Sequence, residues 1–137
     1  KVSQFLGASQ VIPSLRPNDR LAAVLTCFDT FPYSVLPVVG EANQLLGVVG
    51  LDELNHALKT TDARSLLVAA DLMRSDIQPL YPDDRLDVGM QAFAQNDLLV
   101  LPVVDGSPQN RVIGLVRRSD LALAYLQKLH GDPDSSS

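Results

Sequence analysis

Few side chains of this chain have the types and spacing that catalysis requires. His56 and His130 lie far apart in the sequence, and neither stands in a pattern of metal ligands, so we expect both at the surface. Cys27 falls within an apolar helical pattern, which favours a small buried hydrophobe over a reactive thiol. No nucleophile stands with a base and an orienting group, and no glycine-rich phosphate loop occurs. We therefore expect a protein that binds rather than an enzyme, with no catalytic residue and no metal site.

The composition indicates a folded chain that does not bind a nucleic-acid polymer. The 137 residues are 46% hydrophobic, which suffices for one domain or for two small units that share a core. The net charge of −5 repels a nucleic-acid backbone, although a local basic patch can still hold a phosphate. No apolar run approaches the ~18 residues that span a bilayer. Because the chain begins with Lys1 and lacks a signal-peptide pattern, we expect a segment of a larger protein or a chain without its native start.

An internal repeat runs through most of the chain. The phrase VLPVV occurs at 35–39 and again at 100–104. When residues 12–39 are aligned with residues 77–104, twelve of the 28 positions are identical without a gap. After a two-residue insertion the offset becomes 67, which places Gly47 opposite Gly114. The chain is therefore an internal duplication.

Each copy shows the same order of predicted elements, β-α-β-β-α. Apolar runs predict strands, and apolar residues at i, i+3, i+4 and i+7 predict the helices. The pairs Asn18-Asp19 and Asp83-Asp84 precede the first helix of each copy, and each pair is expected to supply the helix cap. A short linking helix is expected at 65–73. The predicted elements lie at 11–15, 21–28, 35–39, 45–50 and 51–58 in the first copy, and at 77–80, 86–93, 100–104, 111–116 and 119–129 in the second.

A copy of about 50 residues cannot bury enough apolar surface alone, so the two copies are expected to pack against each other. The predicted fold class is therefore α/β (α+β), with two β-α-β-β-α repeats related by a pseudo-twofold axis and two equivalent clefts between them. The predicted domains are residues 1–65, the first repeat with an N-terminal lead-in, and residues 66–130, the second repeat with the linking helix. Residues 131–137 form a polar tail.

This repeated order resembles tandem CBS domains, a pair often called a Bateman module. The resemblance covers about residues 3–130 and is carried by the LPVVD strand (101–105), the GLVRRSDL segment (114–121) and the AADLM entry (69–73). It implies a regulatory module that binds an adenosyl ligand, forms a homodimer and acts on a parent protein.

A narrower resemblance concerns the parent protein. The segments LLVAADLM (66–73) and YSVLPVV (33–39) look like the cytoplasmic tail of ClC chloride channels and transporters. This resemblance implies a cytoplasmic location at the inner face of a membrane, with a membrane domain as partner. Other hosts of CBS pairs are IMP dehydrogenases, magnesium transporters and kinase subunits.

The family resemblance also implies site residues. Ribose hydroxyls reach an Asp in the pattern G-h-h-[S/T]-x-x-D, in which Gly114 and Asp120 match and Arg117 occupies the Ser/Thr position. A carboxylate can accept two hydrogen bonds from a vicinal diol, and the adjoining helix N-terminus favours phosphate. In ClC-like pairs the other wall comes from the first copy, where the aromatic ring of Tyr33 can stack on a purine. The expected ligand is ATP, ADP or AMP, and the expected site comprises Ile12 (through its main chain), Tyr33, Ser34, Arg117, Arg118, Ser119 and Asp120.

The equivalent cleft of the other copy lacks these features. Its helix begins after Gly50, and Glu53 replaces the aspartate, so Asp52 and Glu53 oppose a phosphate. Its strand positions are Ile77, Leu98 and Leu99. We therefore expect one nucleotide site rather than two.

Simpler interpretations of the same residues stay open. Ser119 or Asp120 can serve only as a helix cap, worth about 1 kcal/mol. Arg117 and Arg118 can be surface charges or contacts to a parent domain, and Tyr33 can be a packed loop aromatic. Under these interpretations the chain is a structural dimerisation module that binds no ligand.

Overall fold

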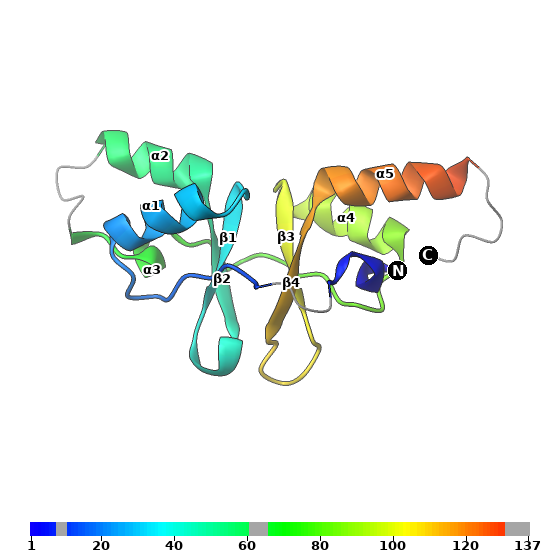
Figure 1. The fold of residues 1–137 in the computed structure, drawn as a ribbon, viewed down its shortest axis with the longest axis horizontal. Helices are drawn as coiled ribbons and strands as arrows, with labels where there is room; N and C mark the ends of the chain where they lie inside the picture. The colour runs from blue at the N-terminus through cyan, green and yellow to red at the C-terminus, as the bar shows by residue number, and fades with distance from the viewer. Residues whose placement is uncertain (8–10, 61–65, 131–137) are drawn as a thin grey trace.

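The computed structural model describes residues 1–7, 11–60 and 66–130, and the predicted polar tail lies outside these residues. Two lobes lie side by side, each built on one antiparallel hairpin with its helices on the outer side (Figure 1). This arrangement confirms the predicted mixed fold of two similar halves. The first lobe contains α1 (Leu21–Thr30), β1 (Val35–Val39), η2 (Glu41–Asn43), β2 (Leu45–Gly50), α2 (Leu51–Thr60) and α3 (Ala69–Leu72). The second contains α4 (Leu86–Asn96), β3 (Val100–Val104), β4 (Val112–Arg117) and α5 (Arg118–Leu129), with η1 (Val2–Phe5) packed beside them.

The first predicted strand of each copy is reduced to a single bridge. Leu15 pairs with Val38 and Leu80 pairs with Val103, both in parallel. The central proline of VLPVV explains the short pairing. The carbonyl of Pro37 faces Leu15, whose N–H donates to it at 2.8 Å, so the missing N–H of Pro37 lies on the same side. The hairpin ladder is unaffected, but the parallel pairing cannot extend.

The aspartates expected to cap the first helix of each copy instead bind backbone N–H groups in the turn before that helix. The side chain of Asp19 accepts from the N–H of Arg16 at 2.8 Å, and Asp84 accepts from the N–H of Tyr81 at 2.9 Å. Both carboxylates therefore close the turn before the helix. The N-cap positions are Arg20 and Arg85, without a side-chain cap. The prediction of capping was wrong, since each aspartate lies one residue too early to cap the helix.

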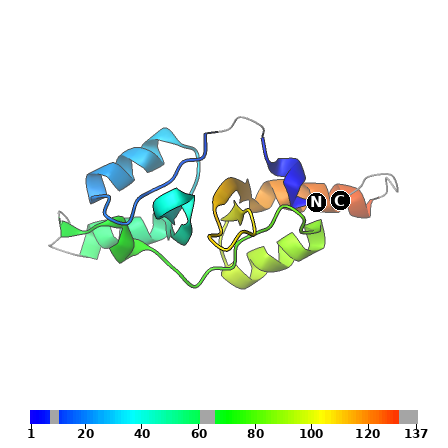
Figure 2. The same ribbon diagram turned by 90° about the horizontal axis from the view of Figure 1, so that it is seen from below.

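The short helical lead-ins pack on opposite lobes. Val2 and Ser3 of η1 donate to carbonyls of the second lobe, at Asp84 and Pro82 (both 2.9 Å). The equivalent residues of α3, Ala69 and Ala70, donate to carbonyls of the first lobe, at Asp19 (2.9 Å) and Pro17 (3.0 Å). The linking helix is thus shorter than predicted, and the segment after it crosses from the first lobe to the second (Figure 2). This exchange ties the two repeats together.

The pseudo-twofold relation is visible where the lobes meet. Gln44 forms an antiparallel bridge with Arg111, which is its own equivalent in the other copy. Close by, Val39, Val104 and Val112 form a buried cluster shared by both hairpins, and β1 also contacts β3. Of the two larger core clusters, one lies within the first lobe, whereas the other fills the second lobe and also includes Val35 of β1 and Val48 of β2. The repeats therefore pack hairpin to hairpin, as the duplication predicts.

Two further sequence expectations can be compared with the structure. Cys27 is half-buried against the first-lobe core, and burial raises the pKa of its thiol, with a further contribution from the Asp19 carboxylate. A raised thiol pKa disfavours the reactive thiolate at neutral pH.

Within the described ranges, no helix combines the length and the apolar character needed to cross a bilayer.

Candidate functional site

The first cleft between the lobes, which we call the basic cleft, has a volume of about 490 Å³. Two arginines and a serine from the start of α5 form one wall, and the residues just before β1 form the other. Its lining residues are Pro32, Ser34, Leu99, Val100, Arg117, Arg118, Ser119 and Ala122. The structure thus brings together Ser34, Arg117, Arg118 and Ser119 of the predicted site.

Tyr33 lies behind Arg117 rather than on the lining of the basic cleft. The guanidinium of Arg117 lies 4.3 Å from the centroid of the Tyr33 ring and donates a hydrogen bond to the carbonyl of Pro32. The ring is half-buried and packs against the core clusters of both lobes. A tight turn holds the ring in place, because the N–H of Tyr33 donates to the carbonyl of Phe31 at 2.9 Å. Tyr33 is therefore a packed aromatic whose exposed side is covered by a cation.

The start of α5 carries no side-chain cap. Its N-cap residue is Arg117, whose side chain is engaged with Tyr33 and Pro32. The N–H of Arg118 donates to the carbonyl of Leu99 at 2.8 Å. The first N–H groups of a helix and its dipole attract anions, so the uncapped helix start and the two arginines favour an anion in the basic cleft.

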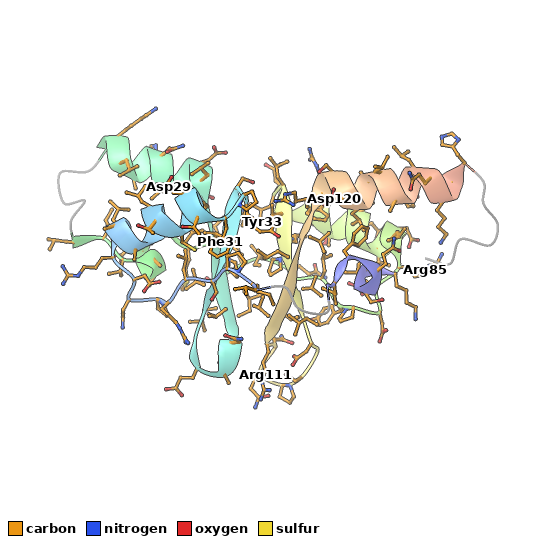
Figure 3. All side chains as sticks on the ribbon, in the orientation of Figure 1. Asp29, Phe31, Tyr33, Arg85, Arg111 and Asp120 are labelled. Atoms are coloured by element: carbon orange, nitrogen blue, oxygen red, sulfur yellow. The ribbon has the colours of Figure 1, made fainter. Side chains whose placement is uncertain are left out.

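Asp120 lies in the first turn of α5, is exposed, and does not line the basic cleft. Tyr33 and Asp120 lie on the same side of the molecule, near the upper ends of the hairpins (Figure 3). Among the described residues, no hydrogen bond or ion pair is found for the carboxylate of Asp120, whereas Asp19 and Asp84, in the turns before α1 and α4, each accept a backbone hydrogen bond. Its carboxylate is therefore available to a ligand that extends from the cleft.

Ile12 of the predicted site and Gly114 of the predicted motif have other surroundings. Ile12 packs against the buried cluster of Val39, Val104 and Val112, away from the lining of the basic cleft. Gly114 is buried, and a Cβ there would lie 2.4 Å from the side chain of Leu6. The small size of Gly114 therefore lets the exchanged lead-in pack on β4. The equivalent Gly47 does the same for the carbonyl of Arg74.

The pseudo-twofold relation generates a second cleft, which we call the acidic cleft. It shares Ser34 and Leu99 with the basic cleft but has a volume of only about 140 Å³. Gly50 stands where Arg117 does in the other copy, Leu98 where Tyr33 does, and Asp52 where Ser119 does. Its lining residues are Ser34, Val35, Gly50, Leu51, Asp52, Glu53, Asp97, Leu98 and Leu99. No arginine or aromatic side chain is among them.

The acidic cleft continues into a larger recess of about 560 Å³ between α2 and the end of α4. Asp97 lines both spaces and adopts a left-handed conformation after α4 (φ 52°, ψ 46°). The adjoining Asn96 is 5% exposed. Its side-chain Oδ1 accepts a hydrogen bond from the N–H of Gln78 (2.9 Å), and its Nδ2 donates to the carbonyls of Gln78 (3.0 Å) and Ala92 (2.7 Å). Sequence reasoning missed Asn96, because its equivalent in the first copy is Phe31. In the part of the chain that the structure describes, no group of three or more His, Cys, Asp and Glu side chains could hold a metal ion.

Comparison of the sequence with known protein families identifies the family of this chain. CBS domains match at residues 2–60 and at residues 68–127. The chain belongs to the CBS domain family. The two matches correspond to the two repeats of the sequence, so the molecule is a CBS pair. CBS pairs are typically regulatory modules rather than catalytic domains.

Two longer curated proteins are similar to this chain over part of their length. An uncharacterized protein of Chlamydia muridarum is 27% identical over 128 residues, and an inosine-5′-monophosphate dehydrogenase of Methanocaldococcus jannaschii is 24% identical over 108 residues. The aligned regions cover 92% and 79% of this chain. They cover only 39% and 20% of the relatives, so most of each relative has no counterpart in this CBS pair.

Solved CBS pairs share the fold over nearly the whole chain. CBSX2 in complex with AMP has a TM-score of 0.74 at 23% identity, covering 94% of this chain and 98% of that chain. The CBS pair of protein MJ0100, in complex with 5′-methylthioadenosine and S-adenosyl-L-methionine, has a TM-score of 0.75 at 20% identity, covering 93% and 96%. At this identity the likeness establishes the fold, and the ligands are properties of those two proteins.

Proposed function

We propose that this CBS pair is a non-catalytic regulatory module that binds one adenine nucleotide in the basic cleft. The observation that carries the proposal is the difference between two equivalent clefts. Only the basic cleft combines arginines, an aromatic ring beside the cleft and an uncapped helix start. The AMP complex of CBSX2 supports the choice of ligand class.

The predicted residues have the following roles in this proposal. Arg117, Arg118 and the start of α5 bind the phosphate group, since charge-assisted hydrogen bonds and the helix dipole both favour an anion there. Tyr33 stacks on the purine, a contact of roughly 1–3 kcal/mol per base in single-strand nucleic-acid binders. Asp120 accepts hydrogen bonds from the ribose hydroxyls. Ser34 borders the base, and Ile12 supports the hairpins from the shared cluster.

A ligand in the basic cleft contacts both lobes, because Ser34 comes from the first and Arg118 from the second. It can shift the angle between the lobes only by binding one arrangement better than another. A Kd of about 100 μM corresponds to about −5.5 kcal/mol. At tenfold excess, such a ligand stabilises the module by about 1.4 kcal/mol, which suits modulation of a parent protein rather than an all-or-none switch.

The parent protein proposed here is a ClC-type chloride channel or transporter, with this CBS pair on the cytoplasmic side of the membrane. The segments LLVAADLM and YSVLPVV support this choice. The gene sequence upstream of Lys1 tests it. A series of apolar spans of about 20 residues each is expected there, and an enzyme domain would instead exclude the proposed parent.

A thermal scan tests nucleotide binding. AMP, ADP or ATP is expected to raise the Tm by a few degrees, the size of shift that about 1.4 kcal/mol produces in a domain of this length. Tyr33→Ala and Asp120→Ala should each abolish the shift. Tyr81→Ala, a tyrosine outside the basic cleft, should leave it unchanged. A shift that survives both site variants would place the nucleotide elsewhere.

A second function, homodimerisation, is favoured by a separate observation. Three leucines of α5 at a spacing of three residues are exposed, namely Leu123 (59%), Leu126 (51%) and Leu129 (62%). Apolar side chains in such a row favour contact with a second copy of the chain. Leu126→Glu is expected to convert a dimer into a monomer in sedimentation equilibrium, whereas Gln127→Glu, the next residue of the same helix, should not. A wild-type chain that sediments as a monomer at all concentrations would exclude this function.

A further inference from the structure

We propose that Arg117 is a gate on the basic cleft that selects ligands bearing a phosphate over neutral or cationic adenosyl compounds. This inference rests on the proposed nucleotide function and adds a residue that determines specificity. It follows from the position of one guanidinium between the cleft and the aromatic ring.

Three observations place Arg117 in that position. Its guanidinium lies over the Tyr33 ring, with 4.3 Å to the centroid. Its Nη2 donates to the carbonyl of Pro32. Pro32, Ser34 and Arg117 all line the basic cleft, but Tyr33 does not. The guanidinium therefore covers the ring on the side of the cleft, and a purine can stack on that face only after Arg117 has moved.

The remaining surface of Tyr33 offers no alternative. The ring packs against the core clusters of both lobes, and the turn from Phe31 fixes its backbone. Because core packing and a backbone hydrogen bond hold Tyr33, whereas the arginine side chain has several rotatable bonds, we infer that the arginine is the part that moves.

The cost of moving Arg117 depends on the ligand. A neutral nucleoside breaks the stacking contact and the hydrogen bond to Pro32 without giving the guanidinium a new partner. Its apparent affinity is then reduced by the fraction of molecules in which the gate is open, about tenfold for a contact of this kind. A phosphate close to Arg118 and the helix start offers Arg117 a stronger, charge-assisted partner. The sulfonium centre of S-adenosylmethionine is repelled by Arg117 and Arg118, and the compound has no phosphate to draw Arg117 away from the ring.

The acidic cleft shows what the position looks like without a gate. Gly50 occupies the position equivalent to Arg117. The side chain of Glu53 lies close to Gly50, since a Cβ added there would be only 2.4 Å from Glu53 Oε2. Leu98 replaces the ring. The arginine and its aromatic partner are thus paired in one copy and both missing from the other.

Isothermal titration with AMP, adenosine and S-adenosylmethionine tests the gate on the intact chain. The wild type should bind AMP and bind adenosine at least tenfold more weakly. Arg117→Ala should raise the adenosine affinity by about tenfold and lower the AMP affinity by about tenfold, so that the preference for AMP falls by about 100-fold. Arg118→Ala is the matched control, because it removes a neighbouring cation of the same cleft without touching Tyr33. It should weaken AMP binding without improving adenosine binding.

The outcomes separate the gate from the proposed function. Equal binding of AMP and adenosine to the wild type, with no gain of adenosine affinity in Arg117→Ala, would overturn the gate and leave nucleotide binding in place. A gain of adenosine affinity in Arg118→Ala as large as in Arg117→Ala would also overturn it. If neither compound binds the wild type or Arg117→Ala, both the gate and the proposed function are wrong. Circular dichroism should show that the three proteins are equally folded.

Discussion

The basic and acidic clefts are formed by equivalent segments of the two repeats and share Ser34 and Leu99. The charged side chains that line them nevertheless have opposite sign. In the basic cleft, Arg117 is the N-cap of α5, which begins with Arg118 and Ser119, whereas in the acidic cleft α2 follows Gly50 and begins with Leu51 and Asp52. Both helices present the positive end of their dipole to the cleft. Asp52 and Glu53 place negative charge in the first turn of α2, while the start of α5 has Arg118 beside it. A duplication thus supplies two equivalent sites, and a few substitutions in a first helical turn leave only one of them suited to an anion.

The largest expected effect comes from making the two clefts alike in charge. Arg117→Glu places a carboxylate beside the helix start and removes the partner of the phosphate. We expect the affinity for AMP, measured by isothermal titration, to fall by at least about 100-fold.

Arg111→Glu is the matched control for that variant. It makes the same change in net charge, but Arg111 lies at the opposite end of the hairpins (Figure 3). Its effect on AMP affinity should stay within about threefold, because the charge is distant and screened by salt. An equal loss in both variants would show that AMP responds only to the overall field.

The next effect concerns Asn96, which adjoins Asp97 of the acidic cleft. Asn96→Ala removes three hydrogen bonds and leaves the N–H and carbonyl of Gln78 without that partner. We expect the free energy of unfolding in urea to fall by about 2 kcal/mol, with AMP affinity unchanged. Gln95→Ala, at an exposed position of the same helix, should be near neutral. A drop in AMP affinity for Asn96→Ala would couple the two clefts more tightly than this account allows.

A smaller effect tests the aromatic difference between the clefts. Tyr33→Leu installs the side chain that the other copy has at Leu98. AMP affinity should fall by about tenfold, since a base-stacking contact is lost. Adenosine should lose affinity as well, which distinguishes this variant from Arg117→Ala. Unchanged AMP binding in Tyr33→Leu would assign the ring a packing role only.

The smallest effect concerns the acidic first turn of α2. Replacing Asp52 and Glu53 by Asn and Gln removes two charges that favour the helix start, and the free energy of unfolding should fall by about 1 kcal/mol. The double variant should still bind one equivalent of AMP, because neutralisation adds neither a cation nor a ring. A second equivalent of bound AMP would show that charge alone had closed the acidic cleft to nucleotide.

The repeated fold could be predicted from the sequence because the identities of the two copies are spaced alike. Apolar periodicity placed both helices and both hairpin strands of each copy close to their observed bounds. The failures have local causes. Pro37 limits its strand to one parallel bridge, and Asp19 and Asp84 close turns instead of capping helices. The exchange of η1 and α3 between the lobes depends on long-range contacts that no local pattern reports.

The candidate site was accessible to sequence reasoning only in part. The family motif pointed to the start of α5, and the structure places Arg117, Arg118 and Ser119 on one cleft with Ser34. The contact between Arg117 and Tyr33 joins residues far apart in the chain and needs coordinates. Asn96 gave no signal, because an asparagine within a helical pattern does not reveal that it is buried.

The account is tested most directly by amide chemical shifts in a titration of the ¹⁵N-labelled chain with AMP. We expect the signals of Arg118, Ser119 and Asp120 to move and to saturate at one equivalent, while those of Asp52 and Glu53 stay in place. Saturation at two equivalents, or movement centred on the start of α2, would contradict the central claim that only one of the two sister clefts accepts a nucleotide.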